Sequence, residues 1–241
     1  MVKTSLKSAV VLLGCLGCVQ LNAGSETAAE AALQAVHSWY DTVDDGSDQD
    51  HLKEFGLVGS GVGPLVQAHQ QLAAQLKRHM DRDQFLVHYR GLARMQLLQA
   101  HAVSTTARDN YVQVFVEEER TMAIEGIPVV AWFEGFIDVA KTQDGWKISS
   151  LENVKPEDII DALGNHAPRR DDPVEAAWAR LQCKAEDCSV IRRALPPNSK
   201  ERLGRVTIQT SHGIDTVSLA RLHDGEWLPI DTETEAIPAH K

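Results

Sequence analysis

The stretch VVAWFEGFIDVA, residues 129–140, decides the fold class. Alternate side chains of a β-strand point to opposite faces. One face of this stretch holds only apolar residues and glycine: Val129, Ala131, Phe133, Gly135, Ile137 and Val139. The other face mixes aromatic and acidic residues: Val130, Trp132, Glu134, Phe136, Asp138 and Ala140. The alternation predicts a long strand whose apolar face is turned toward helices.

Two further strands flank this one in the sequence. Residues 110–118 (NYVQVFVEE) are rich in β-branched and aromatic side chains, and residues 126–128 mark the turn that follows. Gln143-Asp144-Gly145 predicts a hairpin turn into a strand over 146–154. The run Glu117–Arg120 (EEER) reads as a solvated strand end. We therefore expect three consecutive antiparallel strands.

Helices are predicted before the strands. Apolar residues at three- and four-residue steps indicate a helix over 26–43, and a short helical piece follows over 49–55. The glycine-rich segment 56–63 is not a phosphate-binding loop, because no strand precedes it and no Gly-Lys-Ser/Thr follows. Pro64 fits the first turn of another helix. One face of that helix is marked by Leu65, His69, Leu72 and Leu76.

The polar segment 164–173, bracketed by Pro168 and Pro173, predicts a domain boundary. A helix over about 174–182 and strands near 205–210, 216–222 and 226–230 follow it. The fold class is therefore α+β. We expect a signal peptide (1–23), an α+β domain (24–163), a linker (164–173) and a small α+β C-terminal region (174–241).

The first 23 residues have the order of a secretory signal. Lys3 and Lys7 precede an uncharged stretch over 9–19, and the small residue Ala23 lies just before Gly24. The stretch is too short to span a bilayer, which takes about 20 residues. Leu12-Leu13-Gly14-Cys15 resembles a bacterial lipobox, so lipidation at Cys15 is the alternative to cleavage after Ala23. Either way we expect an exported envelope protein, periplasmic or secreted, that is bound to the membrane only if lipidated.

The charge balance excludes one class of partner. The formal net charge of −10 becomes −12 when residues 1–23, with their two lysines and no acid, are removed. Affinity for nucleic acids and anionic membranes comes mainly from Lys and Arg. We therefore expect no nucleic-acid partner.

Cys183 and Cys188 are the only cysteines left after cleavage at Ala23. In an oxidising compartment such a pair predicts a disulfide. On one continuous helix their Cα atoms would be about 8 Å apart, too far for the bond, so the helix should end between them. A metal site is not expected, because the pair lacks two further ligands at a recognisable spacing and the spacing of His69, His79 and His88 fits no zinc pattern.

Two short motifs are similar to the nuclear transport factor 2-like superfamily. Residues 40–48 (YDTVDDGSD), with Leu52 and Phe55 beyond, resemble the first helix and turn of that superfamily, and residues 143–148 (QDGWKI) resemble its final hairpin. The likeness covers about residues 26–160. It implies a cone, in which a curved sheet wraps around helices and leaves a pocket. This fold hosts isomerases, dehydratases and polyketide cyclases as well as domains without chemistry, so it does not give the function.

The face of the sheet that mixes aromatic and acidic residues is predicted to be an interface. Aromatic residues among polar groups are typical of contact surfaces. The aromatic residues on this face are Tyr111, Phe115, Trp132 and Phe136. Three alternatives stay open: packing on the chain's own C-terminal segment, contact with a homodimer mate or another protein, and a ligand surface.

His37, Tyr40 and Asp44 lie at helical steps on the first helix, where a histidine beside a carboxylate could serve as a general base. A polar helix flank is the favoured reading, because nothing in the sequence supplies an oxyanion stabiliser. We therefore expect a non-catalytic protein without a cofactor that binds a protein partner or a small apolar ligand. The alternative is an isomerase-, dehydratase- or cyclase-type enzyme with a His or Asp base.

Overall fold

The computed structural model describes residues 27–46, 62–124, 127–156, 169–196 and 202–236. It confirms the α+β class, with helices packed on antiparallel sheets. The expected signal sequence, the helical piece at 49–55, most of the glycine-rich segment and the first half of the linker (164–168) lie outside the described residues. No described helix is long and apolar enough to span a bilayer.

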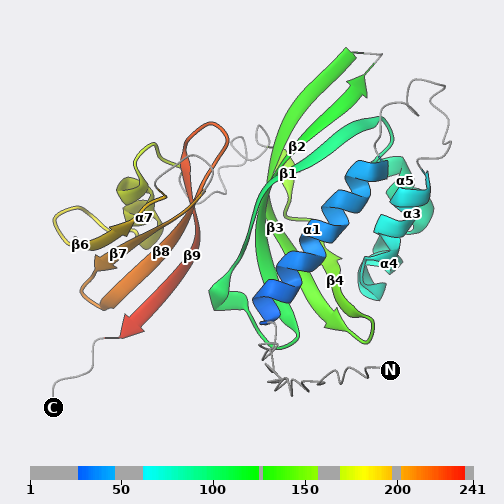
Figure 1. Cartoon of the computed structure of the whole chain (residues 1–241). Coiled ribbons are helices and arrows are strands. Elements are labelled where there is room, and N and C mark those ends of the chain that lie inside the picture. The colour runs from blue at the N-terminus through cyan, green and yellow to red at the C-terminus, as the bar shows by residue number, and fades with distance from the viewer. Residues whose placement is uncertain (1–26, 47–61, 125–126, 157–168, 197–201, 237–241) are drawn as a thin grey trace, which may run out of the picture.

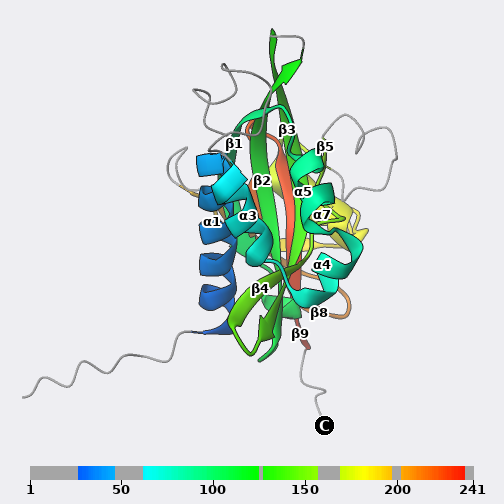
Figure 2. The same cartoon turned by 90° about the vertical axis from the view of Figure 1, so that its right-hand side faces the viewer.

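Within the described residues, four helices precede the first sheet in the chain. The helices are α1 (Ala28–Gly46), α3 (Val62–Gln70), α4 (Ala74–His79) and α5 (Arg82–His88). The strands are β1 (Leu92–Ala102), β2 (Tyr111–Ile124), β3 (Ile127–Thr142) and β4 (Gly145–Ser150), in that spatial order, and β5 (Lys155–Pro156) also pairs with β3. A short 3-10 helix, η1 (Ser104–Thr106), connects β1 and β2. All four helices lie on one side of this sheet (Figures 1 and 2).

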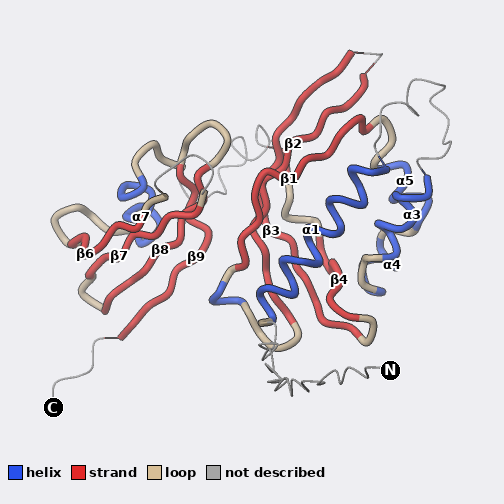
Figure 3. Tube along the Cα trace, in the orientation of Figure 1, coloured by secondary structure: helices blue, strands red, loops and turns tan. Residues whose placement is uncertain are grey.

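The second sheet lies on the other side of the first (Figure 3). It contains β6 (Ser189–Ala194), β7 (Leu203–Gln209), β8 (Gly213–Arg221) and β9 (Trp227–Ala236) in sequence order, preceded by α7 (Pro173–Leu181). One face of this sheet packs on α7 through a core that includes Val206, Ile208 and Val217. On its other face, Leu228 and Ile230 pack with Phe115 of the first sheet.

The predicted alternation is confirmed in the second half of the central strand, whereas Val129, which was expected on the buried face, is 41% exposed. Ile137 and Val139 of β3 are fully buried in the core against the helices, while Phe136 packs on the opposite side with the C-terminal strands. The β2–β3 pairing is continuous from Tyr111↔Ala140 to Ile124↔Ile127, so both strands are longer than the sequence indicated. The cone shape stays a prediction.

Two predicted elements differ from the structure. The prediction of one continuous helix with a face from Leu65 to Leu76 is wrong, because α3 ends at Gln70 and α4 starts only at Ala74. Between them Leu72 bridges Ile148 of β4, and the amide of Ala73 donates to the Ile148 carbonyl at 2.7 Å. The chain gives up helical hydrogen bonds here to pair with the edge of the sheet.

Strand β1 was missed because its sequence LARMQLLQAHA does not alternate cleanly. The β1–β2 register shifts at two places, between Leu92 and Arg94 and between Leu97 and Gln99. Each bulge inserts an extra residue and reverses the side-chain alternation beyond it. A simple period of two therefore cannot reveal this strand.

The predicted disulfide joins Cys183 and Cys188, whose Cα atoms are 6.2 Å apart. The expectation that the helix ends between the cysteines is wrong in detail. Helix α7 ends at Leu181, and Gln182 has a left-handed backbone with φ 54°, so the chain turns before the first cysteine. Such a residue commonly ends a helix.

Gly135 allows the chain to return across β3. It has φ +151°, and a Cβ built on it would lie 1.8 Å from the backbone oxygen of Asn153. Immediately beyond this contact, β5 pairs with β3 through Phe133↔Pro156 and Glu134↔Lys155. Only glycine fits a backbone approach this close.

Gly135→Ala should therefore destabilise the protein strongly, by about 3 kcal/mol or more, because it combines backbone strain with overpacking. Urea denaturation followed by circular dichroism measures the change. Gly63→Ala in α3 is the matched control, since a Cβ there meets nothing within 4 Å. An equal effect of the two substitutions would contradict the role of Gly135.

Candidate functional site

A pocket of about 470 Å³ lies between the helices and the inner face of the first sheet. Helix α1 contributes Trp39 and Tyr40, β2 contributes Glu118 and Arg120, and β3 contributes Phe133. Side chains from α4, from α5, from the residues that follow these helices and from the segment after β4 complete the wall: Leu76, His79, Met80, His88, Tyr89, Leu151, Glu152, Val154 and Pro156. The lining is mainly aromatic and aliphatic with a few polar groups, as is usual for small-molecule sites.

A buried ion pair forms the polar part of this pocket. Glu118 is 0% exposed, and its Oε1 lies 2.5 Å from Nη2 of Arg120. The guanidinium of Arg120 also stands over the ring of Phe133, 4.0 Å from its centre. Residues two apart on a strand share a face, so the alternation of β2 points both charges into the same space.

Two tyrosines add hydroxyl groups to the pair. Tyr40 is buried beside Glu118. Burial first, and then the negative charge of Glu118, raise the pKa of Tyr40 well above its ordinary value. Burial likewise raises the pKa of Tyr89. Both hydroxyls therefore remain protonated, and the pocket keeps them as neutral hydrogen-bonding groups.

Two buried polar atoms at the pocket lack a partner among the described residues. One is Oε2 of Glu118, and the other is the indole Nε1 of Trp39, whose side chain is only 1% exposed. Leaving a buried acceptor or donor unsatisfied costs about 1–3 kcal/mol, more for a charged group. A molecule that offers a hydrogen-bond donor to Glu118 would recover part of this cost.

The helix residues singled out in the sequence do not converge. Tyr40 lies in the pocket, but His37 is exposed on another face of α1. Asp44 accepts a hydrogen bond from the backbone amide of Met95 at 2.9 Å and does not line the pocket. The structure therefore does not bring His37 or Asp44 to Tyr40 as a base.

The interpretation of Glu117–Arg120 as a solvated strand end is wrong. Glu117 is 1% exposed and Glu118 is 0% exposed, on opposite faces of β2. The strand is covered on both faces, by helices on one and by the second sheet on the other. Three consecutive acidic residues directly after three alternating valines were the signal that could have revealed this.

The aromatic face of the sheet packs on the chain's own C-terminal sheet, one of the three alternatives. Phe115 is fully buried with Leu228 and Ile230, and Phe136 packs against this cluster. Trp132 stacks on the ring of His223, with centroids 4.5 Å apart and planes within 7°. Tyr111 lies farther along the face, where its hydroxyl donates to Asp138 at 2.7 Å. Contact with a homodimer mate or another protein stays untested.

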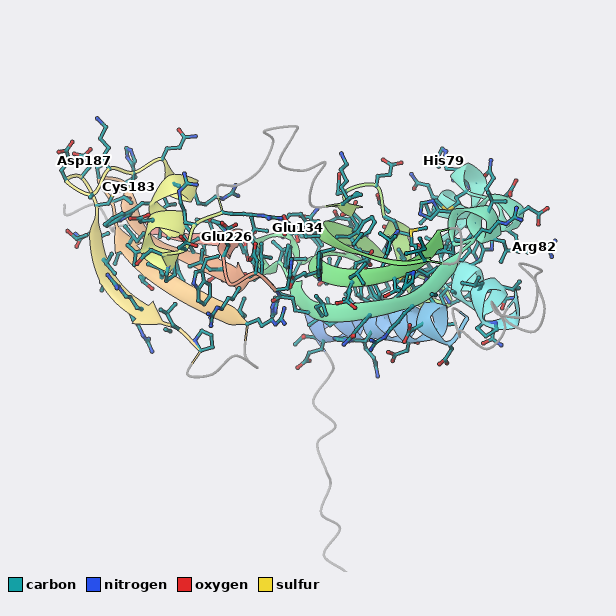
Figure 4. The ribbon with its side chains drawn as sticks, turned by 90° about the horizontal axis from the view of Figure 1, so that it is seen from above. His79, Arg82, Glu134, Cys183, Asp187 and Glu226 are labelled. Carbon is teal, nitrogen blue, oxygen red and sulfur yellow. A yellow bond between two sulfur atoms is a disulfide. The ribbon has the colours of Figure 1, made fainter. Side chains whose placement is uncertain are left out.

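Glu117 is the main polar contact between the sheets. Its carboxylate accepts from Nε2 of Gln99 at 2.6 Å and from Nη1 of Arg202 at 2.9 Å. It also accepts from the backbone amide of His223 at 2.7 Å and lies 3.0 Å from Nδ1 of the same residue. Nearby, Glu134 forms a buried ion pair with Arg169 at 3.0 Å. Figure 4 shows Glu134 at the junction of the two sheets.

No cluster of three or more His, Cys, Asp or Glu side chains suited to a metal ion occurs in the described part of the chain. His79 and His88 line the pocket, whereas the ring of His69 contacts Phe85 and its Nε2 lies 3.1 Å from the carbonyl oxygen of Met80.

Comparison with known proteins gives little. No protein-family model matches the chain, and no curated protein is similar to it in sequence. The intermembrane-space region of the chloroplast protein ARC6, known from a crystal structure, is similar over 53% of this chain and 95% of that one, with 15% identity and a TM-score of 0.35. A likeness this weak carries no argument, and the resemblance to the nuclear transport factor 2-like superfamily stays a prediction.

The contacts around Glu117 between the two sheets lead us to expect that the stability of the protein depends on pH. Nε2 of His101 lies 2.9 Å from Oε1 of Gln99, the residue that donates to Glu117. Burial lowers the pKa of His101 to about 4, although Glu117 opposes the shift. The unfolded chain binds this proton near pH 6.5, so stability contributed by the neutral ring is present above that pH and is lost as pH falls toward 4.

The loss at pH 5 should amount to about 2 kcal/mol. The drop in unfolding free energy between pH 7 and pH 5 should therefore be smaller by about this amount in His101→Gln, measured by urea denaturation. NMR titration provides the direct check. An imidazole of His101 that titrates near 6.5 would contradict the burial argument.

Proposed function

We propose that this chain is an exported, non-catalytic binding protein that holds a small, largely apolar ligand between its helices and its first sheet. The observation that carries the proposal is the unsatisfied Oε2 of Glu118, a fully buried carboxylate oxygen at an aromatic pocket. The ligand that fits is an apolar molecule with one hydrogen-bond donor. The ion pair of Glu118 with Arg120 balances the charge, so a neutral ligand is favoured.

The proposed location is outside the cytoplasm. The disulfide Cys183–Cys188 supports it, because such bonds persist in oxidising compartments. The signal-like residues 1–23 support it independently. Mass spectrometry of the mature protein tests the export route: an N-terminus at Gly24 means a free protein, a diacylglyceryl group on Cys15 means a tethered one, and an intact residue 1 would contradict export by either route.

The enzyme alternative has less support. The base expected from the sequence was His37 or Asp44, and neither residue lines the pocket. The polar groups that line it include an ion-paired carboxylate, two tyrosines that stay protonated, and His79 and His88. This set can hold a ligand by hydrogen bonds and apolar contact.

The fluorescent amine N-phenyl-1-naphthylamine tests the proposal, because it is apolar and neutral and carries one N–H donor. We expect it to bind with enhanced fluorescence. Its N-methyl analogue should bind at least about tenfold more weakly, because it leaves the Glu118 oxygen unpaired. Comparing two probes on the unaltered protein avoids any effect of a substitution on folding.

Val154→Trp should abolish this binding by filling the pocket from its wall. Ile191→Trp is the matched control, because Ile191 is 53% exposed on β6 and outside the pocket. Thermal unfolding establishes that both variants are folded. Equal binding of the two probes, or equal binding by the two folded variants, would overturn the proposal.

A further inference from the structure

A second cavity lies between the two sheets. It has a volume of about 560 Å³ and is walled by the outer face of β2 and β3, by β9, and by the segment after β4. Its apolar wall includes Phe115, Phe136, Leu228 and Ile230, which also form the core between the sheets. None of the residues that line it belongs to the pocket on the helix side. The two spaces are therefore separate sites.

The acidic residues of this cavity already have partners within the chain. Glu134 is paired with Arg169 at 3.0 Å. Asp231 accepts from the hydroxyl of Ser104 at 2.6 Å and from the backbone amide of Thr232 at 2.8 Å, and Thr105 also donates to it. Their negative charges are thus engaged by the protein.

The two basic residues of the cavity have no such partners among the described residues. Lys155 and Arg180 line the cavity and are exposed. Neither side chain forms an ion pair or a side-chain hydrogen bond with any residue of the described ranges. The hydroxyl of Thr232, which also lines the cavity, is buried and has no partner there either. The cavity therefore offers two cationic groups and a hydroxyl donor beside an apolar wall.

We propose that this cavity binds an amphipathic anion: an aliphatic chain with a carboxylate head group. The aliphatic part would lie on Phe136, Leu228 and Ile230, and the head group would be attracted to Lys155 and Arg180. Hydrogen bonds between charged partners are about twice as strong as neutral ones, so the head group supplies specificity. Burial of each CH₂ group supplies about 0.8 kcal/mol. A neutral ligand fits less well, because it leaves both cations without a counter-charge.

Isothermal titration with decanoate tests the site on the full chain. We expect decanoate to bind, and we expect both acetate and decanol to bind at least about tenfold more weakly, because one lacks the chain and the other lacks the charge. If decanol binds as tightly as decanoate, the cationic site is refuted. If acetate binds as tightly, the apolar wall has no part and the proposal also fails.

Substitutions locate the binding. Lys155→Gln with Arg180→Gln should weaken decanoate binding at least about tenfold. Arg192→Gln with Arg193→Gln is the matched control, since these exposed residues of β6 lie outside the cavity. Loss of decanoate binding in Val154→Trp, with binding retained in the Lys155/Arg180 variant, would place decanoate in the helix-side pocket and overturn the proposal. N-phenyl-1-naphthylamine binding should be unchanged in the Lys155/Arg180 variant, so the two sites fail or succeed separately.

Discussion

Glu117 is a carboxylate buried between two sheets, and its hydrogen bonds determine how the two halves of the chain fit together. A buried carboxylate is costly unless donors surround it. Gln99 supplies one donor from the first sheet, whereas Arg202 and His223 supply theirs from the C-terminal region. Without the second sheet, Glu117 would lose most of its partners and Phe115 would lose its cover. The two sheets therefore depend on each other.

The register of β2 connects this junction to the helix-side pocket. Alternate residues of the strand face opposite ways, so the register that turns Phe115 and Glu117 to the second sheet also turns Glu118 and Arg120 to the helices. A register shift of one residue would turn the side chains that now face the second sheet toward the helices, and those that now face the helices toward the second sheet. The apolar alternation of Val112, Val114 and Val116 holds this register, because all three are fully buried against the helices.

The same strands also separate two cavities of different character. Phe133 of β3 lines the helix-side pocket, and its neighbours Glu134 and Phe136 line the cavity between the sheets. In the helix-side pocket Glu118 and Arg120 pair with each other, and Oε2 of Glu118 has no partner among the described residues. In the cavity between the sheets the acidic side chains have partners within the chain, whereas Lys155 and Arg180 form no ion pair with the described residues. A buried polar group without a partner, such as Oε2 of Glu118, weakens a fold, and proteins that keep such groups commonly do so at sites of function.

The sequence by itself determined the α+β class, the central strand 129–140, the Asp-Gly hairpin at 144–145, the C-terminal helix and the disulfide. Each of these features depends on residues that lie close together in the sequence. The tertiary structure alone decided that the aromatic face is covered by the C-terminal sheet and that Glu117 and Glu118 are both buried. It also decided that β1 carries bulges and that a helix breaks at Leu72 to meet Ile148. The physical reason is distance along the chain: periodicity shows which residues share a face, but what covers that face comes from partners such as Arg202 and His223, about a hundred residues away.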